Sequence, residues 1–124
     1  MRIAVLNGPN LNLLGVREPE IYGRTTLAQV EEQLAVLARE LNVVVECYQK
    51  NGEGALIDIV HSFRGRIDGA VVNAGAYSHT SLALRDALAA VSVPFVEVHV
   101  TNVYAREAEG HHSMPAAAAA GGVG

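Results

Sequence analysis

The sequence contains a single cysteine, Cys47, so its 124 residues cannot form an internal disulfide. Cys47 lies in an alternating run over residues 43–49, where a small buried side chain is a commoner role than a reactive thiol. Lysine and arginine form no cluster, and the formal net charge of −4 argues against a nucleic-acid partner. The apolar runs are too short to span a membrane, and no signal peptide is visible. We therefore expect no membrane partner and a cytoplasmic location.

Hydrophobic residues make up 50% of the chain, which predicts one globular domain over residues 1–124 with a core of its own. Apolar runs typical of strands alternate along the chain with helical patterns. The predicted strands are residues 2–6, 43–49, 69–73 and 95–100, and the predicted helices are residues 26–41, 54–64 and 81–91. This order predicts an α/β fold of flavodoxin-like type, with a mostly parallel sheet and helices on both faces.

Two of the helical patterns indicate which side chains are buried. Thr26 and Gln29 resemble a capping box at the start of the first helix. The apolar residues that recur every three or four positions in that helix are Leu27, Val30, Leu34, Leu37 and Leu41. The side chains expected to be buried in the second helix are Leu56, Ile57, Val60 and Phe63.

The last residues have a composition of their own. Residues 116–120 are all alanine and residues 121–124 have the sequence GGVG, where a fifth strand is expected. Alanine and glycine form strands poorly, so residues 113–124 are either a thin edge strand or a disordered tail. The pattern of a final helix is missing, and we expect apolar surface beside the first helix to be exposed unless a subunit contact covers it.

Polar loops follow the first, third and fourth predicted strands. Right-handed crossovers would bring all three loops to one edge of the sheet. The polar residues in these loops and at the strand ends before them are Asn10, Arg17 and Tyr22 for the first loop, Asn73 and His79 for the second, and Glu97, His99 and Arg106 for the third. A guanidinium beside Tyr22 would favour phenolate and make this tyrosine a candidate base. Taken singly, Asn73 and Ser81 are equally well explained as ordinary turn and cap residues.

Five motifs together resemble one known family. They are NGPNLNLLG at residues 7–15, REPEIYG at 17–23, QKNGEG at 49–54, VVNAGAYSHTSLALRDA at 71–87 and PFVEVHVTNVYARE at 94–107. In order and spacing they resemble type II 3-dehydroquinate dehydratase, a shikimate-pathway enzyme of aromatic amino acid biosynthesis. The resemblance implies a flavodoxin-like fold, and trimers that commonly assemble into a homododecamer. It also implies a lyase that dehydrates 3-dehydroquinate to 3-dehydroshikimate without metal or other cofactor.

The resemblance assigns catalytic roles as well. Tyr22 matches the base, and Arg17 matches the arginine that keeps its phenolate charged while the loop closes. Asn10 matches the residue that stabilises the enolate. His99 matches the acid that protonates the leaving hydroxyl, and Glu97, two residues earlier on the same strand face, can orient the imidazole. Glu97 and His99 are alternatively half of a metal site, although no third ligand has convincing spacing.

Substrate binding carries over from the family in the same way. The matching positions are Asn73, His79, Asp86, Val100, Thr101 and Arg106, with backbone N–H groups making the contacts at Val100 and Thr101. Asp86 lies too far along its predicted helix to reach the loops of its own chain easily. In the family the matching aspartate enters the site of a neighbouring subunit, so the resemblance implies that activity requires the trimer.

The chain departs from the family pattern after Arg106. Family members usually have an aromatic residue and an arginine where this sequence has Glu109 and Gly110. Loss of such a charge-assisted contact weakens substrate binding by about ten- to a hundredfold. A second interpretation therefore stays open, in which the chain is a non-catalytic or impaired module of the same fold that binds a small carboxylate or serves in assembly.

Overall fold

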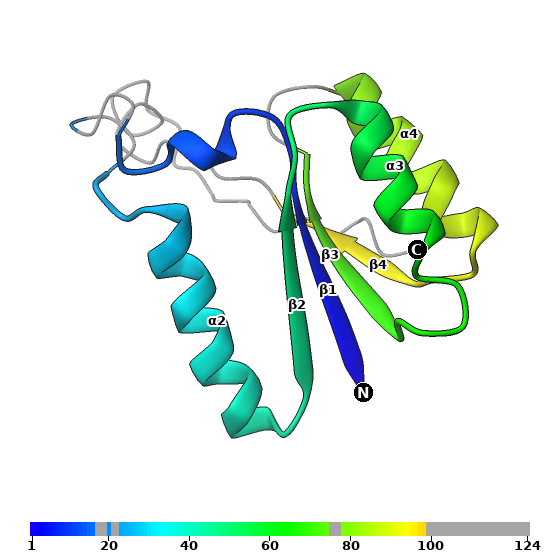
Figure 1. Cartoon of the computed structure of the whole chain (residues 1–124), viewed down its shortest axis with the longest axis horizontal. Helices are drawn as coiled ribbons and strands as arrows, with labels where there is room; N and C mark the ends of the chain where they lie inside the picture. The colour runs from blue at the N-terminus through cyan, green and yellow to red at the C-terminus, as the bar shows by residue number, and fades with distance from the viewer. Residues whose placement is uncertain (17–19, 21–22, 75–77, 99–124) are drawn as a thin grey trace, which may run out of the picture.

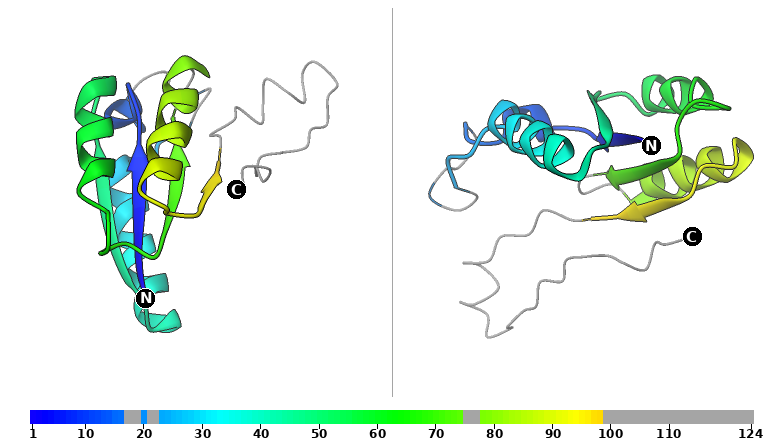
Figure 2. Two further views of the ribbon diagram at one scale, coloured as in Figure 1. Left: turned by 90° about the vertical axis from the view of Figure 1, so that its right-hand side faces the viewer. Right: turned by 90° about the horizontal axis from the view of Figure 1, so that it is seen from below.

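The computed structural model describes residues 1–16, 20, 23–74 and 78–98. Its elements in chain order are β1 (Arg2–Asn7), the short 3-10 helix η1 (Leu11–Leu13), α2 (Leu27–Leu41), β2 (Val44–Gln49), α3 (Glu53–His61), β3 (Gly69–Asn73), α4 (Ser78–Ala90) and β4 (Phe95–Glu97). The four strands form one parallel sheet in the order β2-β1-β3-β4. Helix α2 lies on one face of the sheet, and α3 and α4 lie on the other (Figures 1 and 2). This arrangement confirms the predicted flavodoxin-like α/β fold.

The main core lies between the sheet and the α3–α4 layer. Alternate strand residues point into it, among them Ala4 and Leu6 of β1, and Ala70 and Val72 of β3. From the helical side, the largest fully buried side chains are Phe63, Leu56, Leu84, Leu88 and Val60. Burial of one strand face fixes the register of β1 and β3, because a slip by one residue would turn their apolar side chains to the opposite face. The loops at the strand ends are thereby held in a defined order.

Helix α2 begins and ends with recognisable capping residues. The Thr26 hydroxyl accepts a hydrogen bond from the Gln29 backbone N–H at 3.2 Å, and the Gln29 side chain accepts one from the Thr26 backbone N–H at 2.9 Å. These reciprocal bonds confirm the predicted capping box. At the other end, Asn42 adopts a left-handed conformation with φ of 59°, a common way to end a helix.

The predicted apolar side of α2 is exposed at its carboxyl-terminal half. Leu37 is 46% exposed and Leu41 is 62% exposed, whereas Ala38 is the buried residue of the helix. In the described part of the chain α2 packs mainly on β2, so its stripe extends beyond the surface that covers it. Apolar side chains nearby, Val36 and Val44, are exposed as well. Residues 113–124, which were predicted to form a thin edge strand or a tail, lie outside the described residues.

Three element boundaries differ by more than one residue from those predicted. Helix α3 ends at His61 rather than at residue 64, because the chain tightens into turns there, with the Phe63 backbone N–H donating to the Val60 carbonyl at 2.9 Å. Phe63 is nevertheless fully buried, as predicted. Helix α4 begins at Ser78, three residues before the predicted start. Strand β4 ends at Glu97, while residues 99 and 100 of the predicted strand lie outside the described residues.

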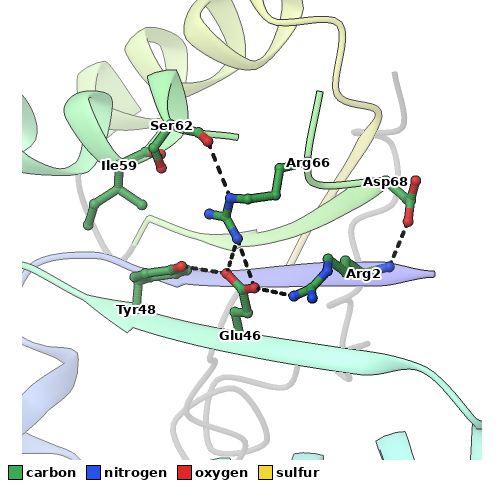
Figure 3. A network of polar contacts seen from close by, with 7 residues as sticks. All are labelled: Arg2, Glu46, Tyr48, Ile59, Ser62, Arg66 and Asp68. Atoms are coloured by element: carbon green, nitrogen blue, oxygen red, sulfur yellow. Dashed lines mark hydrogen bonds and ion pairs between the residues drawn. The ribbon is translucent and has the colours of Figure 1, made fainter. Parts of the chain in front are cut away.

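A polar network centred on Glu46 joins β1, β2 and the turn that precedes β3 (Figure 3). The Glu46 carboxylate accepts hydrogen bonds from Arg66 at 2.8 Å, from Arg2 at 2.9 Å and from the Tyr48 hydroxyl at 2.6 Å. Asp68 accepts a further bond from the Arg2 backbone N–H at 2.6 Å. The hydrogen bond from Arg66, followed by that from Tyr48, lowers the pKa of Glu46 below its usual value.

Candidate active site

The carboxyl ends of β1, β3 and β4 lie side by side at one edge of the sheet. Asn7, the last residue of β1, pairs in register with Asn73, the last residue of β3. On the other side of β3, Val72 pairs with Glu97, the last residue of β4. The structure therefore brings Asn73, Glu97 and the loop after β1 to the same edge, as the sequence predicted (Figure 1).

The loop after β1 lies directly against the loop after β3. The Gly8 backbone N–H donates to the Asn73 carbonyl at 2.7 Å. A Cβ atom at Gly8 would lie only 2.7 Å from the carbonyl oxygen of Ala74, so no larger residue fits without a backbone shift. Glycine at this position thus lets the start of the loop that carries Asn10 lie against the end of β3.

The backbone of Asn10 is held by the turn after β2. Asn10 has φ of 69°, a left-handed conformation that asparagine tolerates better than most residues. Its backbone N–H donates to the side-chain oxygen of Asn51 at 2.9 Å. Gln49 reinforces this arrangement, because its side-chain amide donates to the same Asn51 oxygen and to the Gly8 carbonyl, each at 3.0 Å. Asn10 is thus positioned through its backbone by residues of another strand end.

Gln49 and Asn51 had no predicted role in the site. The sequence signal for them is the motif QKNGEG, which begins at the last residue of the second predicted strand. Because β2 runs parallel to β1, this motif lies at the same sheet edge as the first loop. Its amide side chains can then donate to and accept from a loop about 40 residues earlier in the sequence.

Helix α4 starts at the same edge and runs away from it. His79 lies in its first turn and is exposed. Asp86 is also exposed and lies on the same side of the helix, seven residues further, which corresponds to about 10 Å along the axis. The structure therefore places Asn73 and His79 near the edge, and Asp86 away from the loops of its own chain, as the sequence indicated.

Glu97 is a buried carboxylate with a bidentate partner. Its side chain is 7% exposed, and it accepts hydrogen bonds from Arg85 of α4, from Nη2 to Oε2 at 2.9 Å and from Nε to Oε1. The hydrogen bond with Glu97 also raises the pKa of Arg85 above its usual value. Sequence reasoning missed Arg85, because only the packing of α4 beside β4 brings the two side chains together.

The other predicted site residues, namely Arg17, Tyr22, His99, Val100, Thr101 and Arg106, lie outside the described residues. Within the described ranges, no group of three or more histidine, cysteine, aspartate or glutamate side chains could hold a metal ion. No helix in those ranges is long and apolar enough to cross a membrane. Cys47 is half-buried, and burial raises the pKa of its thiol, which fits the packing role predicted for it.

The family model for dehydroquinase class II matches residues 1–124. The 3-dehydroquinate dehydratase of Gemmatimonas aurantiaca is 60% identical over 121 residues, which cover 98% of this chain and 80% of the relative. Catabolic 3-dehydroquinase 1 of Aspergillus terreus is 56% identical over 119 residues, which cover 96% of this chain and 78% of the relative. The crystal structure of the type II dehydroquinase from Butyrivibrio crossotus has a TM-score of 0.76 at 46% identity, over 92% of this chain and 80% of that one. The chain therefore belongs to the type II dehydroquinase family.

Proposed function

We propose that this chain is a 3-dehydroquinate dehydratase, a lyase that removes water from 3-dehydroquinate through an enolate to give 3-dehydroshikimate in the shikimate pathway. The observation that carries the proposal is the similarity to 3-dehydroquinate dehydratases along 98% of the chain. The position of Asn10, Asn73 and Glu97 at one edge of the sheet supports it, because ligands of such folds bind outside the carboxyl ends of the strands.

The first chemical requirement is a base that removes a proton from the carbon next to the ketone. Tyr22 takes this role in the proposal, and Arg17 keeps its side chain in the phenolate form. A neighbouring positive charge favours the charged form of a tyrosine, whose ordinary pKa is about 10. This explains why a residue that is normally a weak acid serves as a base near neutral pH.

The second requirement is stabilisation of the enolate and protonation of the leaving hydroxyl. Asn10 stabilises the enolate oxygen, and the contact of its backbone with Asn51 supports this role because it fixes the residue before substrate arrives. His99 donates the proton to the leaving hydroxyl. Glu97 orients the imidazole, and a buried carboxylate held by a guanidinium is well suited to that task.

Substrate binding relies on the remaining residues at this edge. Asn73 and His79 bind the ring hydroxyls and carboxylate, together with the backbone N–H groups of Val100 and Thr101. Backbone donors suit an anionic substrate on a chain whose net charge is −4. Arg106 adds a positive charge for the same carboxylate.

A trimer, or a dodecamer built from trimers, completes the site in this proposal. Asp86 lies away from the loops of its own chain, and the same side of α4 carries Leu82, which is 61% exposed. Leu82 and Asp86 therefore lie on a side of α4 that is open to a neighbouring subunit. Asp86 then enters the site of the neighbouring subunit. A cytoplasmic location also stays a prediction.

The direct test is to add 3-dehydroquinate to the purified chain and follow the ultraviolet absorbance of the conjugated enone product. A rise in absorbance that depends on protein concentration is the expected result. The relatives named as dehydratases favour this outcome over the alternative of a non-catalytic carboxylate-binding module. Saturable binding of 3-dehydroquinate without any enone, in properly assembled protein, would favour the module instead.

A further inference from the structure

Glu97 ends strand β4 at the proposed active edge, and its side chain is only 7% exposed. A carboxylate removed from water is stable in its charged form only if hydrogen-bond donors or positive charge replace the lost hydration. On β3, the residue paired with Glu97 is the apolar Val72, which cannot supply such compensation. On the helical side, α4 brings the guanidinium of Arg85 to both carboxylate oxygens.

The geometry of this contact restricts both the charge and the orientation of the carboxylate. Two N–H groups of a planar guanidinium bind the two oxygens of Glu97, so rotation of the carboxylate breaks at least one hydrogen bond. A lysine ammonium would provide the charge but not the fixed two-point contact. The Arg85 side chain is 48% exposed, so its outer part is not needed to fill the core.

We propose that Arg85 is a positioning residue of the dehydratase, which holds the Glu97 carboxylate ionised and in one orientation at the end of β4. The inference rests on the proposed function, in which Glu97 orients the acid His99. Arg85 itself touches neither substrate nor the reacting atoms in this scheme. Arg85 acts through Glu97, and its contact links α4, which carries His79 and Asp86, to β4, the strand that precedes the proposed acid His99.

A merely structural role for the ion pair makes different predictions. If Arg85 only ties α4 to β4, its removal lowers thermal stability and leaves the rate per folded molecule nearly unchanged. If Arg85 positions Glu97, its removal lowers kcat in protein that is still folded and assembled, with little change in KM. The effect of removing Arg85 must also disappear when Glu97 no longer carries a charge, because Arg85 then has no carboxylate to position.

The experiment compares kcat and KM of the parent with those of Arg85→Ala, Arg85→Lys, Glu97→Gln and the double variant Arg85→Ala with Glu97→Gln. Arg64→Ala is the matched control, because Arg64 is an exposed arginine that makes no ion pair within the described residues. Folding and assembly of each variant are checked by circular dichroism and mass. Arg85→Ala is also assayed with guanidinium chloride well below its denaturing range, because truncation of a half-exposed side chain leaves the carboxylate open to the added cation.

We expect Arg85→Ala to lower kcat by about ten- to a hundredfold, the range for a lost charge-assisted hydrogen bond. Arg85→Lys should lower kcat by a smaller factor than Arg85→Ala. Added guanidinium should restore part of the kcat of Arg85→Ala, and Arg64→Ala should have the kcat of the parent. In the Glu97→Gln background, Arg85→Ala should lower kcat by no more than about twofold.

Additive losses in the double variant would overturn the inference, and so would a kcat of folded Arg85→Ala equal to that of the control. Failure of guanidinium to restore activity in Arg85→Ala, with Arg85→Lys as inactive as Arg85→Ala, would do the same. A parent that forms no enone would refute the proposed function, and this inference with it. An active parent whose Arg85 variants behave like the control would refute the inference alone.

Discussion

Asn51 offers a test of how the loop that carries Asn10 is held in place. Its side-chain oxygen accepts two hydrogen bonds, one from the Asn10 backbone N–H at 2.9 Å and one from the Gln49 side chain at 3.0 Å. Asn51→Ala removes both bonds and leaves the left-handed backbone of Asn10 without its support from the turn after β2. The loop should then sample other conformations, in which the Asn10 side chain is misplaced for the enolate-stabilising role proposed for it.

The size of the effect follows from these two contacts. A hydrogen bond contributes about 0.5–1.5 kcal/mol net, and exposed bonds such as these lie near the lower limit. Two of them amount to about 1–1.5 kcal/mol, which corresponds to about a five- to tenfold loss of kcat if the whole effect falls on the chemical step. Asn51 is exposed, so its truncation leaves no cavity in the core.

Two further variants separate this explanation from general destabilisation. Asn51→Asp keeps an oxygen for both donors, so its kcat should stay within about twofold of the parent. Asn42→Ala alters another left-handed asparagine, at the end of α2, and should lower the melting temperature without a loss of kcat. The assay is enone formation at saturating substrate, with folding followed by circular dichroism. The reasoning fails if Asn51→Ala keeps the parental kcat, or if Asn51→Asp loses as much as Asn51→Ala.

Other predictions concern the base, the assembly, acid stability and the departure from the family pattern. Tyr22→Phe should lower kcat by about a hundred- to ten-thousandfold without unfolding the protein, and near-parental turnover would remove Tyr22 from the role of base. Inactive Asp86→Ala chains mixed with inactive Tyr22→Phe chains under subunit exchange should regain activity if Asp86 completes a neighbouring site, and exchange without rescue would confine each site to one chain. The lowered pKa of Glu46 means that its stabilising contribution is present above its usual value of 4.5 and is lost as pH falls through the lowered pKa. Glu46→Gln should therefore reduce the free energy of unfolding at pH 7 by about 0.5–1 kcal/mol, with a smaller difference from the parent in urea titrations at lower pH. Gly110→Arg should lower KM if the family's arginine is missing, and an unchanged KM in folded protein would show that another group supplies the contact.

Local features of the fold could be predicted because their causes are local. The capping box of α2 needs only Thr26 and Gln29, three residues apart, and both of its hydrogen bonds are present. The β3 strand has the predicted limits, because its apolar run is short and is followed by a turn sequence. The parallel order follows from alternation of strands and helices, since a parallel pair requires a crossover connection.

The spacing of Leu37 and Leu41 alone does not predict that these two side chains are exposed. Their spacing is that of a buried stripe, but burial depends on whether another element lies opposite each turn of the helix. In the described part of the chain α2 extends past the surface that covers it, and Leu41 is left 62% exposed. A periodic pattern therefore defines a face of a helix, and tertiary packing decides how much of that face is covered.

The supporting contacts of the candidate site were missed for a related reason. Arg85 and Glu97 are twelve residues apart on different elements, and Asn51 and Asn10 are forty-one residues apart, so no local pattern links the members of either pair. In each pair, one residue was predicted from its position at or just after a strand end, because a parallel sheet gathers its carboxyl ends at one edge. Its partner depends on which side chains the neighbouring elements direct toward that edge. Position along the strands therefore indicates which loops supply the groups proposed to act on substrate, whereas the three-dimensional packing shows which side chains hold those groups in position.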